Sequence, residues 1–89
     1  MGKYVPLGEY LANCPQIRCA LSLSKIEEII DAKLPPSARE YRQWWENYKA
    51  HVQARDGWLS VGWKVESVNK NLSTISFIRA HLVHLESGS

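Results

Sequence analysis

Most residue types that could carry chemistry in this 89-residue sequence fall between positions 37 and 55. If this stretch forms one helix, a row of side chains three or four residues apart includes Trp44, Asn47, His51 and Arg55. Arginine and asparagine can read base edges, and an aromatic ring can stack on a base. The row is therefore a candidate nucleic-acid-binding surface. In an alternative interpretation, Trp44 packs beneath a hairpin that the sequence predicts further along.

Basic residues surround this row. Residues 33–55 hold five lysines and arginines against two glutamates, whereas the whole chain has a net charge of only +2. Arg39, Arg42 and Lys49 would lie on the adjacent helix face and could contact phosphates, or they could form an ordinary solvated face. Lys70 lies in a predicted hairpin loop. It could touch a nucleic-acid backbone, or the loop could be a simple polar turn.

The sequence does not indicate a catalytic or metal site. His51 has no acidic residue securely on its face, and we find neither a glycine-rich phosphate loop nor a paired-carboxylate motif. Cys14 and Cys19 have four residues between them and His81 and His84 have two, and the histidine spacing does not fit a zinc finger. With no export signal, both cysteines are expected to be reduced. We therefore predict a non-catalytic protein without metal or cofactor.

Turn formers and apolar periodicity predict the elements that position these residues. Pro6 suits the first turn of a helix that ends at Asn13. Residues 17–21 alternate well enough for a short strand. Ser24 and Glu27 form a capping box that opens a second helix.

A third helix is predicted after the paired prolines at 35 and 36, with a second capping box formed by Ser37 and Glu40. Its core face is predicted to hold five residues at helical spacing: Ala38, Tyr41, Trp45, Tyr48 and Val52. Whether this helix continues through a last turn across Asp56 and Gly57 is left open. Gly62 is a natural left-handed cap for that last turn.

From residue 63 onward, the apolar residues recur at every second position, as expected for β-strands. Alternating apolar residues flank the polar stretch 69–73 and predict a β-hairpin, with Trp63, Val65 and Val68 before it and Ile75 and Phe77 after it. We therefore predict a single α+β domain over residues 3–80, with about three helices and a three-stranded antiparallel sheet. Residues 81–89 are expected to be a flexible tail or a non-native extension. The element order resembles a winged helix, whose third helix enters the DNA major groove and whose hairpin loop is the wing.

A combination of short motifs carries a more specific resemblance, which covers about residues 3–79. The motifs are Lys3-Tyr4-Val5-Pro6-Leu7, Leu34-Pro35 with Ser37-Ala38, Trp44-Trp45 with Asn47, His51 with Gln53-Ala54, and Gly62-Trp63 with Val65-Glu66-Ser67-Val68. The chain is similar to a prokaryotic and phage family of small domains of unknown function, found alone or attached to nuclease-like proteins. The resemblance implies a nucleic-acid setting and no particular activity. Members have one residue fewer between Gln53 and Trp58, so Asp56-Gly57 looks like an insertion.

Together these observations predict a winged-helix-like DNA-binding module that uses residues 37–55 and the hairpin loop 69–73. Duplex DNA is the expected partner. The alternative is a protein-interaction module of phage or mobile-element origin that inhibits or adapts a host system, with a host or nuclease-related protein as partner. Four tryptophans and four tyrosines favour this alternative, because aromatic residues are enriched at interface hot spots. A cytoplasmic location without membrane contact is expected, and the oligomeric state is left open.

Overall fold

The computed structural model describes residues 2–80, so the expectations for residues 81–89, including His81 and His84, lie outside the described residues. The chain forms α1 (Val5–Ala12), β1 (Arg18–Ser22), α2 (Leu23–Ile30) and α3 (Pro36–Glu40). Three short turns follow: the 3-10 turn η1 (Arg42–Trp45), the π-helical turn η2 (Ala54–Trp58) and the 3-10 turn η3 (Leu59–Val61). The hairpin strands β2 (Trp63–Asn69) and β3 (Thr74–Arg79) come last. The predicted mixture of helices and sheet is confirmed.

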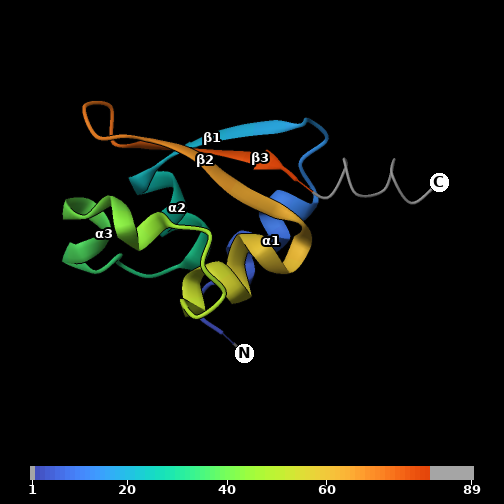
Figure 1. Ribbon diagram of the computed structural model, residues 1–89, viewed down its shortest axis with the longest axis horizontal. Helices are drawn as coiled ribbons and strands as arrows, with labels where there is room; N and C mark the ends of the chain where they lie inside the picture. Colours follow the sequence, from blue (N-terminus) through green and yellow to red (C-terminus); the bar gives the residue numbers. More distant parts are fainter. Residues whose placement is uncertain (1, 81–89) are drawn as a thin grey trace.

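The three strands form one antiparallel sheet in the order β1-β3-β2. In Figure 1 the sheet lies as one layer above α1, α2 and the segment between α3 and β2. β1 pairs with β3 from Arg18 opposite Ile78 to Ser22 opposite Thr74, and β2 pairs with β3 with one bulge between Val65 and Ser67. The predicted hairpin, and its pairing with the strand near residues 17–21, are therefore confirmed.

A chain of aromatic rings fills the space beneath the sheet. Trp45, Trp58 and Phe77 are almost completely buried. Trp45 stacks on Trp58 with ring centroids 5.8 Å apart, and Trp58 lies 5.6 Å from Phe77. Each of the two indoles also satisfies its N–H group: Trp45 donates to the Ala38 carbonyl oxygen at 2.7 Å and Trp58 to the Asn47 Oδ1 at 3.0 Å. Buried indoles usually require such partners.

The ends of the first helix and of the last turn agree with the sequence. Pro6 lies in the first turn of α1, and Asn13 is the residue at its C-terminal end. Gly62 closes η3 with a φ of 80°, the left-handed conformation predicted for it. A second glycine is required by packing, because a Cβ atom at Gly8 would lie 2.6 Å from the Gly57 carbonyl oxygen. The contact of α1 with η2 therefore depends on Gly8.

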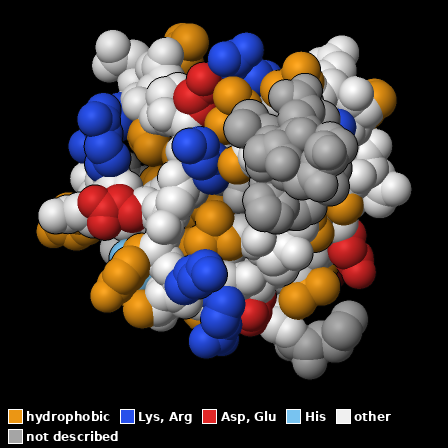
Figure 2. All heavy atoms as spheres, turned by 45° about the vertical axis from the view of Figure 1, so that its right-hand side comes forward, with side chains coloured by type: hydrophobic (Ala, Val, Ile, Leu, Met, Phe, Trp, Pro, Cys, Tyr) orange, Lys and Arg blue, Asp and Glu red, His pale blue; other side chains and the backbone are white. Residues whose placement is uncertain are grey.

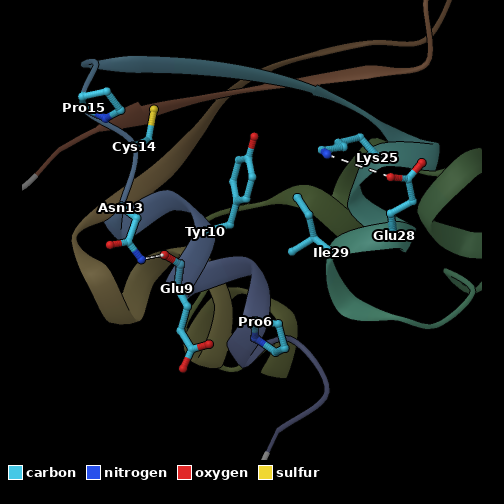
Figure 3. A pocket seen from close by; sticks show the side chains of 9 residues that line it. All are labelled: Pro6, Glu9, Tyr10, Asn13, Cys14, Pro15, Lys25, Glu28 and Ile29. Carbon is cyan, nitrogen blue, oxygen red and sulfur yellow. Dashed lines mark hydrogen bonds and ion pairs between the residues drawn. The ribbon is translucent and has the colours of Figure 1, made fainter.

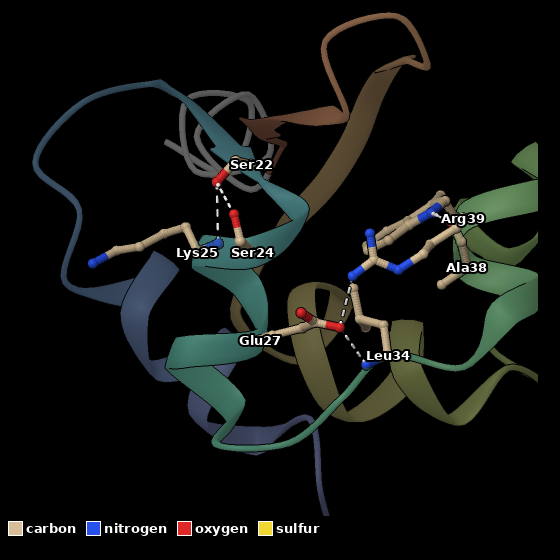
Figure 4. A network of polar contacts seen from close by, with 8 residues as sticks. Ser22, Ser24, Lys25, Glu27, Leu34, Ala38 and Arg39 are labelled. Carbon is tan, nitrogen blue, oxygen red and sulfur yellow. Dashed lines mark hydrogen bonds and ion pairs between the residues drawn. The ribbon is translucent and has the colours of Figure 1, made fainter.

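Both predicted capping boxes are wrong. α2 begins at Leu23, directly after β1, and Ser22 caps it by accepting from the Lys25 backbone N–H at 3.0 Å. Ser24 therefore already lies inside the helix, as Figure 4 shows. α3 begins at Pro36 after an extended Pro35 and has no side-chain cap, so Ser37 already lies inside the helix. Pro36 has no backbone N–H, and the Ala38 backbone N–H donates to the Pro35 carbonyl oxygen at 3.0 Å.

Glu27 does not take part in a helix cap. Its side chain instead connects α2 to the start of α3. Its carboxylate accepts from the Leu34 backbone N–H at 2.9 Å and from the Arg39 guanidinium at 2.9 Å (Figure 4). The Leu34 hydrogen bond, opposed by burial and assisted by Arg39, holds the pKa of Glu27 below its usual value. The ionised carboxylate is therefore part of the folded connection between the two helices.

The predicted long helix over 37–55 is also wrong. α3 ends at Glu40, because Tyr41 adopts an extended conformation with φ −121° and ψ 122°. Trp45 is buried as predicted, but three residues of the proposed core face are exposed, with fractions of 57% for Tyr41, 59% for Tyr48 and 42% for Val52. Tertiary packing of the tryptophans overrides the local helical period. The chain between α3 and β2 is a series of turns.

Trp45→Ala should remove most of the stability of the protein. The side chain is 2% exposed and holds the end of α3 through its indole N–H, and truncating such a residue costs about 3–5 kcal/mol. The half-buried Trp44 packs at the edge of the same cluster, so Trp44→Ala should cost less. Chemical denaturation of both variants tests this order. A less stable Trp44→Ala variant would show that the described packing is wrong.

Glu27→Gln should lower the melting temperature at neutral pH. A folded-state pKa below the unfolded value contributes stability that is present above the unfolded pKa and is lost as pH falls through the folded pKa. The difference from the native chain should therefore shrink as the pH falls below about 4.3, the usual glutamate pKa. Melting curves across this range measure it. Glu28→Gln is the matched control. The Glu28 side chain is 73% exposed, and its Oε1 atom lies 3.9 Å from the Lys25 Nζ atom.

Candidate nucleic-acid interface

A hollow of about 220 Å³ lies between α3 and the hairpin, and we call it the α3–hairpin hollow. Its floor is apolar, and its rim carries two basic side chains together with amide and hydroxyl groups. The lining residues are Leu23, Ala38, Arg39, Val68, Asn69, Lys70, Ser73, Thr74 and Ile75. None of them is acidic, although the Glu27 carboxylate outside the lining is paired with Arg39. Within residues 2–80, the hollow therefore combines one ion-paired and one unpaired cationic side chain with hydrogen-bond donors.

Each cation of the hollow is held in place by one contact. Arg39 forms an ion pair with Glu27 at 2.9 Å, and the Lys70 ammonium donates to the Glu40 backbone carbonyl at 3.1 Å. Because a guanidinium has five N–H donors and an ammonium three, both side chains keep donors free for a ligand. In Figure 1 the hairpin tip projects over the end where α3 lies. The structure therefore brings together Arg39 and Lys70, which are 31 positions apart in the sequence.

Arg42 lines an adjoining hollow of about 300 Å³ along β2. Glu46 and Glu66 line the same hollow, so its charge is balanced. Arg42 is exposed, and it forms no ion pair with any residue in the range 2–80. Arg42 therefore lies outside the lining of the α3–hairpin hollow, and its own surroundings do not favour an anion.

Asn47, expected at the ligand surface, is occupied within the fold. Its Oδ1 accepts from the Trp58 indole N–H at 3.0 Å and from the Val65 backbone N–H at 2.7 Å, and its Nδ2 donates to the Val65 carbonyl at 3.0 Å. These bonds attach the irregular segment to β2 and to the core. The structure gives Asn47 a positioning role: its amide oxygen is used twice within the fold, and one N–H of its amide nitrogen is left over on an exposed residue.

Trp44 and His51 do not form one exposed row. Trp44 is half-buried and packs edge-on against Tyr4 and Trp45, with centroid distances of 5.7 and 4.6 Å. This favours the packing interpretation, with Tyr4 and Trp45 as the contacts. His51 is half-buried beside the Tyr48 ring, and its Nδ1 is buried without a hydrogen-bond partner in the described part of the chain. Neither ring is presented with Arg39 and Lys70.

The remaining predicted cations are spread over the surface. Arg55 pairs with Asp56 at 3.1 Å, and Lys49 is exposed and forms no ion pair within residues 2–80. On the face shown in Figure 2, basic side chains are scattered among apolar and acidic ones. The α3–hairpin hollow is therefore a better candidate than a general electrostatic surface.

Sequence reasoning missed the exposed tyrosines. Their helical spacing predicts that Tyr41 and Tyr48 lie in the core, but both side chains are more than half exposed. The available signal was Asn47, a turn former in the middle of the supposed helix. Tyr41 directly follows Glu40, whose carbonyl oxygen holds Lys70. An exposed aromatic residue is therefore adjacent in sequence to the residue that holds Lys70.

Comparison with known proteins gives one match. A family model described as a domain of unknown function, DUF7662, matches residues 4–80. No curated protein and no solved structure gives a significant match. The family match agrees with the resemblance to small domains of unknown function, and the prokaryotic or phage setting stays a prediction. Within residues 2–80, no cluster of three or more metal-binding side chains occurs and no helix is long and apolar enough to cross a membrane.

Asn47→Ala should destabilise the fold by about 1–3 kcal/mol, because it leaves the buried Trp58 indole N–H and the Val65 N–H without their acceptor. Asn47→Asp keeps an acceptor oxygen at this position and should lose less. Urea denaturation of the two variants measures the difference. Equal stability of the native chain and Asn47→Ala would contradict the positioning role.

Proposed function

The chain belongs to the DUF7662 family, whose function is unknown, and we propose from its own geometry that it is a non-catalytic nucleic-acid-binding module. The proposed contact is the α3–hairpin hollow, with phosphate groups at Arg39 and Lys70. The observation that carries the proposal is a rim with two cations, hydroxyls and an amide, and no carboxylate in the lining. Phosphate contacts of this kind supply most of the affinity of sequence-independent binding.

The geometry favours single-stranded nucleic acid as the ligand. A recognition helix over residues 37–55 was the reason to expect duplex DNA, and α3 alone has five residues and is about 7.5 Å long at 1.5 Å per residue. Exposed Tyr41 lies between Arg39 and Arg42 in the sequence and can offer a stacking surface. Aromatic rings beside basic side chains are the usual means of binding single strands without sequence preference.

The winged-helix interpretation supports the same location. The strand order β1-β3-β2 and the order of helices and strands are those expected of a winged helix. In that interpretation the loop between β2 and β3 is the wing, and Lys70 lies in it. The winged-helix assignment remains part of this proposal, with the turns after α3 replacing a long recognition helix.

The test is a binding titration with a labelled oligodeoxythymidine of roughly 20 nucleotides, longer than the roughly 4–16 nucleotides covered by one small binding fold. Affinity should fall as salt rises from about 50 to about 200 mM. Lys70→Ala and Arg39→Ala should each weaken binding and reduce the salt dependence by about 0.7 in the log–log slope, the value for one phosphate on a single strand. Tyr41→Ala should cost about 1–3 kcal/mol of binding free energy.

Lys64→Ala is the matched control, because Lys64 is an exposed cation at the opposite end of β2. It should bind nearly as the native chain does. Melting curves must accompany Arg39→Ala, since Arg39 also pairs with Glu27. Absence of binding at low salt, or equal losses for Lys64→Ala and Lys70→Ala, would overturn the proposal. Tighter binding of a duplex of the same length would restore duplex DNA as the ligand.

A second candidate function, protein binding, rests on the exposed apolar surface of the turns. Tyr48 and Val52 are exposed by 59% and 42%, and Tyr48 is further fixed by edge-on contact with His51 at 5.2 Å. A rigid exposed tyrosine is typical of interface hot spots. A pull-down from a prokaryotic lysate separates the two functions: a host protein retained after nuclease treatment and lost with Tyr48→Ala supports protein binding.

A further inference from the structure

The outer edge of β1 has unpaired backbone groups. Just before β1, the Ile17 carbonyl oxygen accepts from the backbone of β3 at 2.8 Å, and just after it the Leu23 N–H donates to the hairpin loop at 2.9 Å. Residues that face β3 alternate with residues that face away in an antiparallel pair. The backbone N–H and carbonyl groups of Arg18 and Ala20 therefore point away from the sheet. Within residues 2–80, no other residue hydrogen-bonds to them there.

The two edges of the sheet differ in how they are protected. At the β2 edge, Asn47 occupies both backbone groups of Val65, and a bulge follows. β1 has no proline and pairs without a bulge. Its one charged side chain is drawn away from the edge, because Arg18 pairs with Glu66 of β2 at 3.1 Å, across β3. Proteins usually block exposed edges, since an unblocked edge can pair with another chain. The β1 edge can therefore accept an added strand.

A groove of about 670 Å³ lies beside this edge, between α1 and α2. Pro15, before β1, and Lys25, after it, both line the groove, so β1 connects its two ends. In Figure 3 β1 runs above the groove, and the Tyr10 ring is directed toward the strand from α1, with Ile29 on α2. The groove therefore lies on the helix side of β1.

Side chains of a strand added to β1 would alternate between the groove and solvent. On β1 itself, Leu21 is buried and Cys19 packs against the core, whereas Ala20 is exposed on the opposite face. Side chains of the added strand beside Cys19 and Leu21 would therefore point to the helix side. Tyr10 and Ile29 of the groove offer them apolar contact.

We propose that the β1 edge and the groove bind an extended peptide segment of a partner protein, which adds a fourth strand to the sheet. Two apolar side chains at alternate positions of the peptide occupy the groove. Backbone hydrogen bonds to Arg18 and Ala20 supply affinity, and the groove selects the side chains, as is general for strand addition.

The charge of the groove favours a basic residue in the peptide. Glu9, Lys25 and Glu28 line it. The Lys25 Nζ atom lies 3.9 Å from the Glu28 Oε1 atom, whereas Glu9 forms no ion pair within residues 2–80. A lysine or arginine of the peptide therefore complements the Glu9 carboxylate.

A second copy of β1 does not fit this site as well. The side chains that would have to enter the groove are its Cys19 and Leu21, and these pack against the core of their own chain. An extended segment without a core of its own has both faces free. The site is also separate from the α3–hairpin hollow, since no residue lines both, so the inference goes beyond nucleic-acid binding.

The experiment selects random phage-displayed peptides of about ten residues, the upper length of ordinary strands, on the native chain. We expect the enriched sequences to carry apolar residues two positions apart and a lysine or arginine nearby. A fluorescent synthetic peptide of the enriched sequence is then titrated. Tyr10→Ala should weaken its binding several-fold, and Glu9→Gln should reduce the salt dependence. Enrichment of no common pattern would overturn the proposal.

Ala20→Pro tests the backbone contact. It removes the N–H that points to the peptide, so binding should weaken by about tenfold or more. Because this N–H faces away from β3, proline leaves the hydrogen bonds of the sheet in place, and melting curves check the fold. Ala20→Val is the matched control, since it keeps the N–H and should bind as the native chain does.

N-methylated peptides repeat the test on the unchanged protein. Methylation should abolish binding at one set of alternate amides and be tolerated at the other set. Equal binding by Ala20→Pro and Ala20→Val, or equal effects of methylation at both sets, would overturn the proposal. A dimer that the peptide does not displace and that Ala20→Pro dissociates would show that a second copy is the occupant, and would overturn it as well.

The peptide site and the nucleic-acid site can fail independently. Lys70→Ala should bind the peptide as the native chain does, and Ala20→Pro should bind oligodeoxythymidine as the native chain does. Loss of peptide binding in Lys70→Ala would contradict a separate site.

Discussion

The indole N–H groups of Trp45 and Trp58 determine the course of the chain between α3 and β2. Trp45 donates to the carbonyl oxygen of Ala38 at 2.7 Å, and in a continuous helix this oxygen would accept from the backbone N–H of Arg42. Trp58 requires an acceptor as well and finds it in Asn47, which is fixed in turn to β2. A buried indole N–H without a partner would cost about 1–3 kcal/mol. Satisfying both groups replaces a long helix by a series of turns.

The α3–hairpin hollow follows from this early helix end. The last carbonyl groups of any helix have no partner within the helix. At the end of α3, Lys70 of the hairpin loop donates to the Glu40 carbonyl, and this contact brings the loop to the helix. Arg39, in the last turn of α3, is turned back to Glu27 of α2. The same break in the helix releases Tyr41 to the surface. Core packing and surface chemistry therefore have one origin.

Features with a local cause were predictable from the sequence. Pro6 and Gly62 impose particular backbone conformations, and alternation of Trp63, Val65, Ile75 and Phe77 can only be buried by a strand pair. The first capping box is wrong because Ser22, at the end of β1, caps α2, and the second is wrong because α3 begins at Pro36, so that Ser37 already lies inside the helix. A local sequence pattern does not show which of two nearby residues caps a helix, because neighbouring elements determine where the helix begins.

The candidate site was predictable in its residue types and not in its arrangement. Arg39 and Lys70 were recognised as cations that could meet phosphates, but their proximity depends on a backbone carbonyl exposed by a helix break. Tyr41 and Tyr48 share the spacing of a core face with Trp45, and only the packing of Trp45 against Trp58 separates buried from exposed positions.

The rings from Tyr4 to Phe77 are in contact with one another, and they give the folded protein intrinsic spectroscopic signals. Trp45 and Trp58 are stacked with an interplanar angle of 23°, and indoles held this close couple their electronic transitions. Their fixed orientation gives a near-ultraviolet circular dichroism band that disappears when tertiary packing is lost. Trp44 is the outer tryptophan of this chain and directly contacts Trp45. A change in its surroundings therefore reaches the fluorescence of the whole indole group, with no added label.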